Sequence, residues 1–351
     1  MTASDPNRET AHSIEALCRL GLDSRELGRR IGSHLSRRLT ADAFCFGLID
    51  PSTLLVTDHV IEGISSDAAA DAAYNEYLVD DVLKFAELAR AKDRVGILSE
   101  ATGGDPTLSH RYRALLPLID ASHELRAAFV IDDRCWGGMS LYRSGSRPDF
   151  SPDDVDLFRR FSVTVAAALR RAAHRPASVA VGGPAEAGVL ILDHDFRLLT
   201  ANPAGQEWLE ELATDITGAP PIAVLDVAAR GKNSPLGAYA RIRGTSGRWL
   251  SVQASPLTGD RHPATIAVLI QPAPASEVIE VLQLAYGLTP RERDILEQVI
   301  SGRPSRAIAG LLHITTATVQ DHLKSIFAKV GVRSRGELVA RMLDGVFNRP
   351  S

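Results

Sequence analysis

The chain has 351 residues, more than one ordinary hydrophobic core holds, so we expect two or three domains. With 45% apolar and 23% charged residues it has the composition of a globular protein, and its net charge of −4 excludes a chain that coats nucleic acid along its whole length. The charge is uneven, because residues 286–351 carry a net +4 and the first 285 residues −8. A basic C-terminal part on an acidic body is typical of a DNA-binding module attached to domains of another kind.

Disulfides, metals and membrane anchors are not indicated. Cys18, Cys45 and Cys135 are widely spaced and odd in number, and no Cys/His spacing predicts a zinc site. The N-terminus lacks the basic and then apolar pattern of a signal peptide, and no apolar run approaches the ~20 residues that span a bilayer. We therefore expect a cytoplasmic protein with no metal, cofactor or membrane contact.

Residues 1–175 are predicted to form an α+β domain. Apolar residues repeat at helical spacing between Ile14 and Leu39, and β-rich runs that follow predict an antiparallel sheet with a hairpin. We place its strands at residues 43–49, 54–61, 127–131 and 135–142. Ser151 and Pro152 then open a closing helix, because serine caps a helix and proline fits its first turn.

This segment resembles a GAF domain, chiefly in the stretch WGGMSLYRSGSRPDFSPDDVDLFRRF at residues 136–161. GAF domains bind small molecules or dimerise, so the resemblance implies a GAF-like sensor domain. It implies no particular ligand, because the sequence contains no recognisable ligand motif. His59, His110, His123 and His174 lack the paired spacing of metal or haem ligands, and we interpret them as ordinary histidines.

Residues 176–273 are predicted to form a second α+β domain, after a linker rich in proline and glycine at residues 174–184. Its strands are expected at residues 188–193, 198–201, 238–243, 248–254 and 264–270. The stretch GVLILDHDFRLLTANPAG at residues 188–205 resembles a PAS domain. The helical middle, residues 222–231, is short for that fold, so the resemblance does not imply a complete ligand cavity. A second linker at residues 271–276 and a linker helix within residues 274–285 follow.

Residues 286–351 predict an all-α domain of four helices. Thr289 and Glu292 form a capping box around Pro290, and Gly302 supplies a left-handed stop to the first helix. The third helix is expected from Thr316 to Val330. At 100° per residue its apolar side chains fall within about 40° of one another. They are Val319, Leu323, Ile326 and Val330.

The opposite side of this third helix has small and polar residues that suit the major groove of DNA. Gln320 can pair with adenine, Asp321 can accept from cytosine and Lys324 can donate to guanine, so we predict that these three contact bases. Phosphate contacts are predicted for Thr316, Thr318, Ser325, Lys329, Arg333 and Arg335. On the fourth helix, Leu338 and Met342 belong to an apolar face that we expect to pair with a second copy.

The domain strongly resembles the LuxR-type helix-turn-helix. The matching residues are Leu288, Thr289, Pro290, Arg291, Glu292, Gly302, Ile308, Ala309, Leu312, Thr318, Val319, His322, Leu323, Ile326, Lys329, Gly331, Val332, Ser334, Arg335, Glu337 and Leu338. The resemblance implies that the third helix reads bases and the fourth makes dimer contacts. Two residues depart from the pattern: Ala307 replaces a usual acid, and His313 replaces a usual turn glycine.

Together these features predict a bacterial-type transcription regulator that binds double-stranded DNA as a homodimer or higher homo-oligomer. A small-molecule or partner signal would act through the GAF-like and PAS-like domains. One alternative is a signalling enzyme. It is disfavoured because the sequence contains no nucleophile–base pair, no metal constellation and no phosphate-binding loop. The other is a ligand-free dimerisation or partner-binding protein whose DNA-binding tail is secondary.

Overall fold

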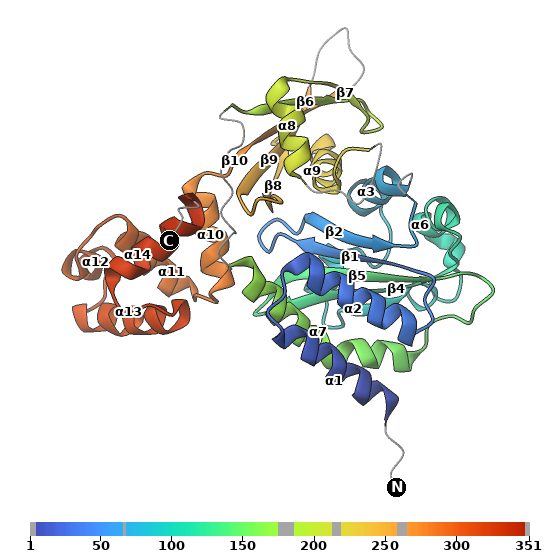
Figure 1. Cartoon of the computed structure of the whole chain (residues 1–351), viewed down its shortest axis with the longest axis horizontal. Coiled ribbons are helices and arrows are strands. Elements are labelled where there is room, and N and C mark those ends of the chain that lie inside the picture. Colours follow the sequence, from blue (N-terminus) through green and yellow to red (C-terminus); the bar gives the residue numbers. More distant parts are fainter. Residues whose placement is uncertain (1–4, 66–67, 175–185, 213–218, 258–264, 348–351) are drawn as a thin grey trace.

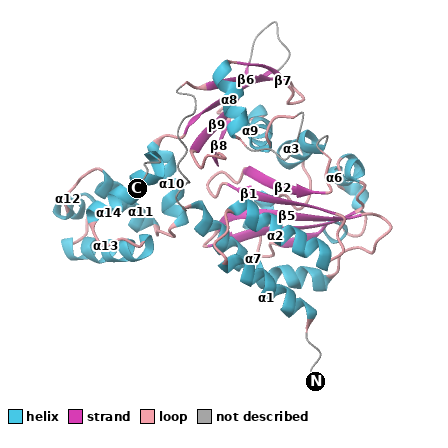
Figure 2. Ribbon diagram, viewed as in Figure 1, coloured by secondary structure: helices cyan, strands magenta, loops and turns pink. Residues whose placement is uncertain are grey.

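The computed structural model describes residues 5–65, 68–174, 186–212, 219–257 and 265–347. Two antiparallel sheets and a helical bundle form three lobes (Figure 1). The predicted order of two α+β parts followed by an all-α part is confirmed, and Figure 2 shows that the C-terminal lobe contains only helices. The linker predicted at residues 174–184 lies, apart from His174, outside the described residues.

The first sheet has five strands in the order β2-β1-β5-β4-β3. The strands are β1 (Ala43–Ile49), β2 (Val56–Glu62), β3 (Val95–Ile97), β4 (His123–Ile131) and β5 (Arg134–Arg143). On one face pack α1 (Pro6–Arg19), α2 (Ser24–Arg38) and α7 (Pro152–Ala173). The other helices are α3 (Ala69–Leu78), α4 (Phe85–Arg90), α5 (Leu98–Ala101) and α6 (His110–Ala114), with 3₁₀ turns at Pro106–Leu108 and Leu116–Ile119.

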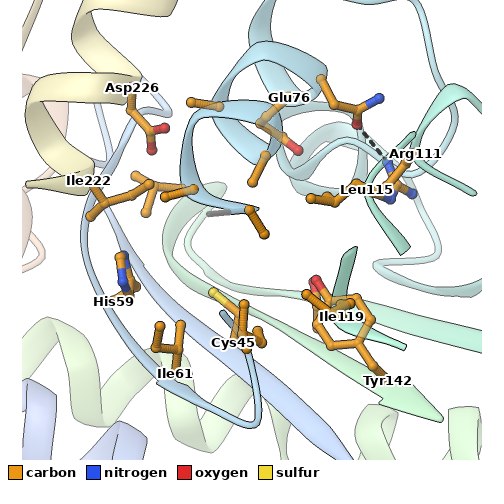
Figure 3. Close-up of a pocket in the computed structure, with 18 of the residues that line it drawn as sticks. Cys45, His59, Ile61, Glu76, Arg111, Leu115, Ile119, Tyr142, Ile222 and Asp226 are labelled. Atoms are coloured by element: carbon orange, nitrogen blue, oxygen red, sulfur yellow. Dashed lines mark hydrogen bonds between the residues drawn. The ribbon is translucent and has the colours of Figure 1, made fainter. Parts of the chain in front are cut away.

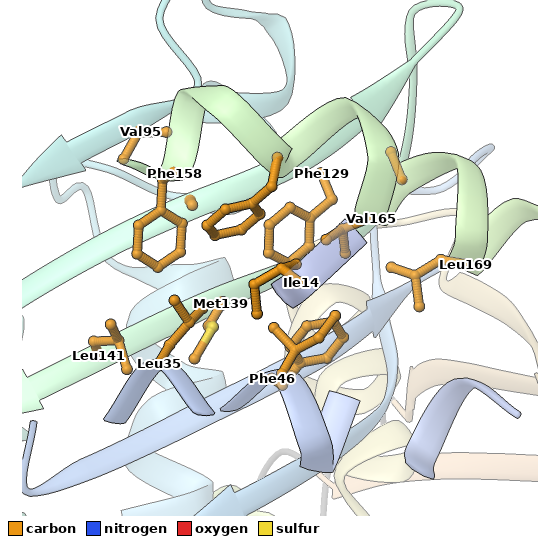
Figure 4. Close-up of a cluster of buried hydrophobic side chains, with 14 of the residues drawn as sticks. Ile14, Leu35, Phe46, Val95, Phe129, Met139, Leu141, Phe158, Val165 and Leu169 are labelled. Carbon is orange, nitrogen blue, oxygen red and sulfur yellow. The ribbon is translucent and has the colours of Figure 1, made fainter. Parts of the chain in front are cut away.

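The first core lies between this sheet and the α1, α2 and α7 layer (Figure 4). Ile14 and Leu35 of the helices are 0% exposed, and the rings of Phe46 and Phe129 stack with centroids 5.4 Å apart. The predicted hairpin is present, and its turn residues Asp132 and Asp133 both have positive φ. The sequence analysis did not predict the helices and the short strand between residues 69 and 119, which contain few regular apolar repeats.

The second sheet has the order β7-β6-β10-β9-β8, which is the same relative order as in the first. Its elements are β6 (Gly188–Leu192), β7 (Leu198–Ala201), α8 (Pro203–Glu211), α9 (Ile222–Lys232), β8 (Ala238–Arg243), β9 (Trp249–Leu257) and β10 (Thr265–Pro272). Helix α9 packs on the sheet through Val224, Val227 and Ala228, each 0% exposed. The face on which a cavity would lie is therefore filled by α9, which also contacts α3 and β2 of the first lobe.

The C-terminal bundle comprises α10 (Ala275–Ala285), α11 (Pro290–Ile300), α12 (Ser305–Leu311), α13 (Thr316–Val330) and α14 (Arg335–Phe347). Strand β10 extends to Pro272, so only residues 273–274 separate it from α10, and the longer linker predicted at residues 271–276 is wrong. Val278 and Leu282 of α10 pack in the core of the bundle, so α10 is part of the bundle rather than a free connection.

Among the described residues, no helix combines the length and the apolar character that a bilayer crossing requires.

Candidate nucleic-acid interface

Helix α13 has the bounds and the buried stripe that the sequence predicts. Thr315 caps it by accepting a hydrogen bond from the backbone N–H of Thr318 at 3.1 Å, and Gly331, with φ +74°, ends it. The four buried residues of the helix are Val319, Leu323, Ile326 and Val330. The burial of this stripe orients α13 in the bundle and leaves its other face toward solvent.

The three predicted base-contacting residues are exposed on that outer face. Asp321 and Lys324 pair with each other at 3.1 Å, and their side chains are 74% and 77% exposed. Gln320 donates from Nε2 to Ser305 Oγ of α12 at 3.1 Å. Since these contacts are short-range and open to water, each can be exchanged for a ligand at little cost.

The turn between α12 and α13 brings the two helices together at a small residue. Ala309 is 6% exposed, and its carbonyl accepts from the Ile314 backbone N–H at 3.0 Å. His313 adopts the left-handed conformation, φ +53°, that the glycine common at this position favours. The departure at His313 therefore leaves the turn in place, at the cost of local strain.

Two of the predicted phosphate contacts lie in a network around Glu292 of α11. Ser325 Oγ donates to Glu292 Oε1 at 2.6 Å, and Lys329 Nζ pairs with Glu292 Oε2 at 2.6 Å. Burial acts to raise the pKa of Glu292, but hydrogen bonds from Lys329, Ser325 and Thr289 outweigh it and lower the pKa from 4.5 to about 2. The carboxylate thus ties α13 to the capping box of α11.

The remaining predicted phosphate contacts lie at or near the ends of α13. Thr316 is exposed, and Thr318 Oγ1 lies 2.8 Å from Thr315 Oγ1. Arg333 is exposed, and its backbone N–H donates to Glu337 Oε2 at 2.8 Å. Arg335 donates to the carbonyl oxygens of Val299 and Arg303. Arg335 thus also serves as a contact within the bundle.

The predicted dimer contacts need correction. Leu338 and Met342 are both 0% exposed and lie in the core of their own bundle. The helical spacing of apolar residues cannot distinguish a core face from an interface, because both bury the same kind of side chain. In this structure neither residue has surface to offer a second copy.

The start of α14 has a variant of the capping box. Ser334 Oγ accepts from the Glu337 N–H at 3.2 Å, but the Glu337 carboxylate accepts from the backbone N–H of Arg333. Sequence reasoning also missed Arg303 and Arg306, which are exposed near the start of α12. The basic charge of the C-terminal part is the sequence feature that includes these two arginines. Net charge alone does not show which face of the domain a residue occupies.

Residues 287–342 match the family described as bacterial regulatory proteins, luxR family. Helices α11 to α14 form a luxR-family helix-turn-helix domain. The match covers α11, α12, the turn at His313 and α13, and it ends within α14 at residue 342.

Known transcriptional regulators resemble part of the chain. The transcriptional regulatory protein MctR of Rhizobium johnstonii is 44% identical over 57 residues, which are 16% of this chain and 27% of that protein. The nitrate/nitrite response regulator NarL of Escherichia coli is 48% identical over 50 residues, 14% of this chain and 23% of that protein. The chain thus spans about a quarter of the length of these relatives.

Solved structures give weaker similarities. A GAF domain of a phosphoenolpyruvate-protein phosphotransferase from Coxiella burnetii has a TM-score of 0.36 and 14% identity, over 48% of this chain and 96% of that one. Escherichia coli SdiA has a TM-score of 0.38 and 10% identity, over 98% of this chain and 99% of that one. Similarities of this size support no functional conclusion for the first two lobes.

Proposed function

We propose that the protein is a transcription regulator that binds double-stranded DNA through α13 of its luxR-family domain. One observation carries the proposal: α13 buries its whole apolar stripe and keeps Gln320, Asp321 and Lys324 in solvent. A helix of this kind fits a major groove about 12 Å wide. Such a regulator acts in the cytoplasm, where bacterial DNA lies.

The proposed roles divide by position on the helix. Gln320, Asp321 and Lys324 contact base edges after the Asp321–Lys324 pair opens. Thr316, Thr318 and Arg333 contact phosphates, since the N-terminus of α13 adds its own amide donors there. For Ser325, Lys329 and Arg335 a phosphate contact requires rearrangement of the bonds to Glu292 or to backbone carbonyls, so we assign them a supporting role.

The proposed route of the signal runs through α10. Glu280 of α10 pairs with Arg241 of β8 at 2.8 Å and accepts from Ser52 of the first lobe at 3.1 Å. Tyr286, at the end of α10, contacts the ring of His174 at the end of α7, with centroids 4.5 Å apart. Because α10 also packs in the luxR-family core, a change between the first two lobes would alter the placement of α13.

We further propose three functional units: residues 1–175, residues 176–273 and a DNA-binding unit that begins at residue 274, the residue before α10. The active form is a homodimer, since two copies of α13 can then meet half-sites about one DNA turn apart. A small molecule is the proposed signal. We do not favour an enzyme, because the relatives that share the luxR-family domain are named as transcriptional regulators.

A DNA selection followed by a salt titration tests the proposal. The full chain is mixed with randomised duplexes, and bound sequences are enriched and then measured by fluorescence anisotropy between 50 and 200 mM salt. We expect an enriched motif and an affinity that falls steeply with salt. Lys324→Ala should weaken binding, whereas Asp71→Ala on α3 serves as a control. Failure to enrich any motif would falsify the proposal. So would an affinity that changes neither with salt concentration nor with Lys324→Ala.

A further inference from the structure

A cavity of about 110 Å³ lies where the first two lobes meet (Figure 3). The floor is the face of the first sheet that α7 does not cover, with Cys45, Ile61 and Tyr142. Helix α3 forms one wall. The start of α9, from which Ile222 and Asp226 border the cavity, forms a second wall. Arg111, Leu115 and Ile119 line another side. The second lobe thus supplies part of a chamber whose floor belongs to the first.

We propose that this cavity binds a small uncharged molecule with a carbonyl-type acceptor, and that the occupant is held by side chains of both lobes. The inference rests on the proposed sensor role and names the site and the ligand class. A cavity of this volume has room for roughly eight to ten non-hydrogen atoms, since one water takes about 10–15 Å³ on the same measure. Most of its lining residues are apolar, with alanine and isoleucine the most frequent, so most of the occupant is apolar.

Asp226 supplies the first polar group. It is 3% exposed, and Tyr77 donates to its Oδ2 at 3.2 Å while accepting from the Val56 backbone N–H at 3.0 Å. Burial raises the pKa of Asp226 well above its ordinary value, and the nearby charge of Glu76 adds to the shift. Among the described residues Oδ1 has no hydrogen-bond partner, so the neutral acid can donate one bond to an occupant.

Arg126 supplies the second polar group. Its guanidinium lies over the ring of Phe85 and donates from Nη2 to Glu76 at 2.9 Å. Nε and Nη1 are buried and make no hydrogen bond to any residue that the structure describes. Neither nitrogen has accessible surface, so Arg126 holds Glu76 at the edge of the cavity rather than donating to an occupant. Asp226 is therefore the donor, and a donor selects an amide, ester or ketone oxygen.

Charge around the cavity excludes ions. Arg111 and Arg126 are already matched by carboxylates, with Arg111 paired to Glu124 at 2.7 Å and Arg126 to Glu76 at 2.9 Å. Asp81 adds a further carboxylate near Arg111. A buried anion would find no spare positive charge, and a cation would face a neutral acid and carboxylates that are already bonded.

The experiment uses three probes of matched chain length on the full protein: hexanamide, hexanoate and hexylammonium. Binding is measured by titration calorimetry. We expect hexanamide to bind and the two ions to bind at least tenfold more weakly. Lack of hexanamide binding up to its solubility limit, or equal binding of an ion, overturns the inference.

Variants test the named groups. Asp226→Leu should weaken hexanamide binding at least tenfold, whereas Asp226→Asn keeps an uncharged donor and should stay within threefold. Ala72→Phe fills the cavity from α3 without changing α9, and it should abolish binding even if Asp226→Leu disturbs the fold. Asp71→Leu is the matched control, because Asp71 is exposed on the same helix and does not line the cavity. Binding that survives Ala72→Phe overturns the inference.

Hydrogen exchange tests the contribution of both lobes. Hexanamide should slow the exchange of amides in α9 as well as in α3 and β1. Protection confined to the first lobe would show that α9 does not hold the ligand, and the inference would fail. DNA binding is measured separately by anisotropy, so loss of the cavity proposal leaves the regulator proposal to be judged on its own result.

Discussion

Arg241 and Asp50 form an ion pair that joins the second sheet to the first, with Nη2 and Oδ1 2.8 Å apart and side chains 0% and 1% exposed. Arg241 Nε also donates to Asp50 Oδ2 at 2.9 Å, so the guanidinium binds the carboxylate through two parallel bonds. The same guanidinium reaches Glu280 of α10. One arginine thus links the first two lobes to the helix that enters the luxR-family core.

This pair predicts strong coupling between the two residues. Asp50→Asn or Arg241→Met alone should destabilise the contact between the lobes by about 3 kcal/mol, because each leaves a buried group without its partner. The double change Asp50→Leu with Arg241→Met should recover most of that loss. Calorimetry measures the stability and small-angle scattering the radius of gyration, which should rise in the single variants. Equal stability of the single and double variants would contradict the prediction.

Glu292 predicts an acid-sensitive luxR-family domain. Its pKa in the folded protein is about 2 against an ordinary 4.5, so its stabilising effect is complete above pH 4.5 and is lost as the pH falls toward 2. We expect the domain to lose about 2 kcal/mol over that range. Glu292→Gln should lower the melting temperature at pH 6 and flatten the dependence below pH 4.5. The measurement is calorimetric melting at pH 3, 4 and 6, with Glu297→Gln as an exposed control on the same helix.

Two residues of the luxR-family domain should affect DNA binding differently. Gln320→Ala should cost about 1–3 kcal/mol on the selected motif and relax the preference at one base pair, since it removes a base contact. Arg333→Ala should weaken binding to all sequences alike and reduce the salt slope by about one, since it removes a phosphate contact. Anisotropy with the selected motif and with single-base variants separates the two. The assignments would be reversed if Arg333→Ala changed the motif instead.

Gly32 predicts a packing constraint in the first lobe. A Cβ at Gly32 of α2 would lie 2.2 Å from Cε2 of Phe44, whose side chain is 1% exposed, so α2 and β1 could not keep their present separation. Gly32→Ala should cost about 1–3 kcal/mol. The control is Gly310→Ala on α12, where nothing lies within 4 Å of the added Cβ. It should stabilise its helix by about 1 kcal/mol, and thermal melting compares the two.

The sequence alone determined the features that depend on near neighbours in the chain. The Thr289–Glu292 capping box and the stripe from Val319 to Val330 follow from spacing and angle, which local helix geometry fixes. The strand at residues 43–49 was also predicted at its observed bounds.

Tertiary structure decided what depends on residues far apart in the chain. The helical spacing of Leu338 is the same whether it packs in its own bundle or against a second copy. Only the packing shows that it is buried in its own bundle. Asp226 and Arg126 are 100 residues apart, so no local sequence pattern predicts that both line one cavity. Ser325 and Lys329 likewise contact Glu292 because α13 packs against α11, which their spacing in the sequence does not predict. Local order follows from the sequence, whereas the contacts between elements depend on how they pack.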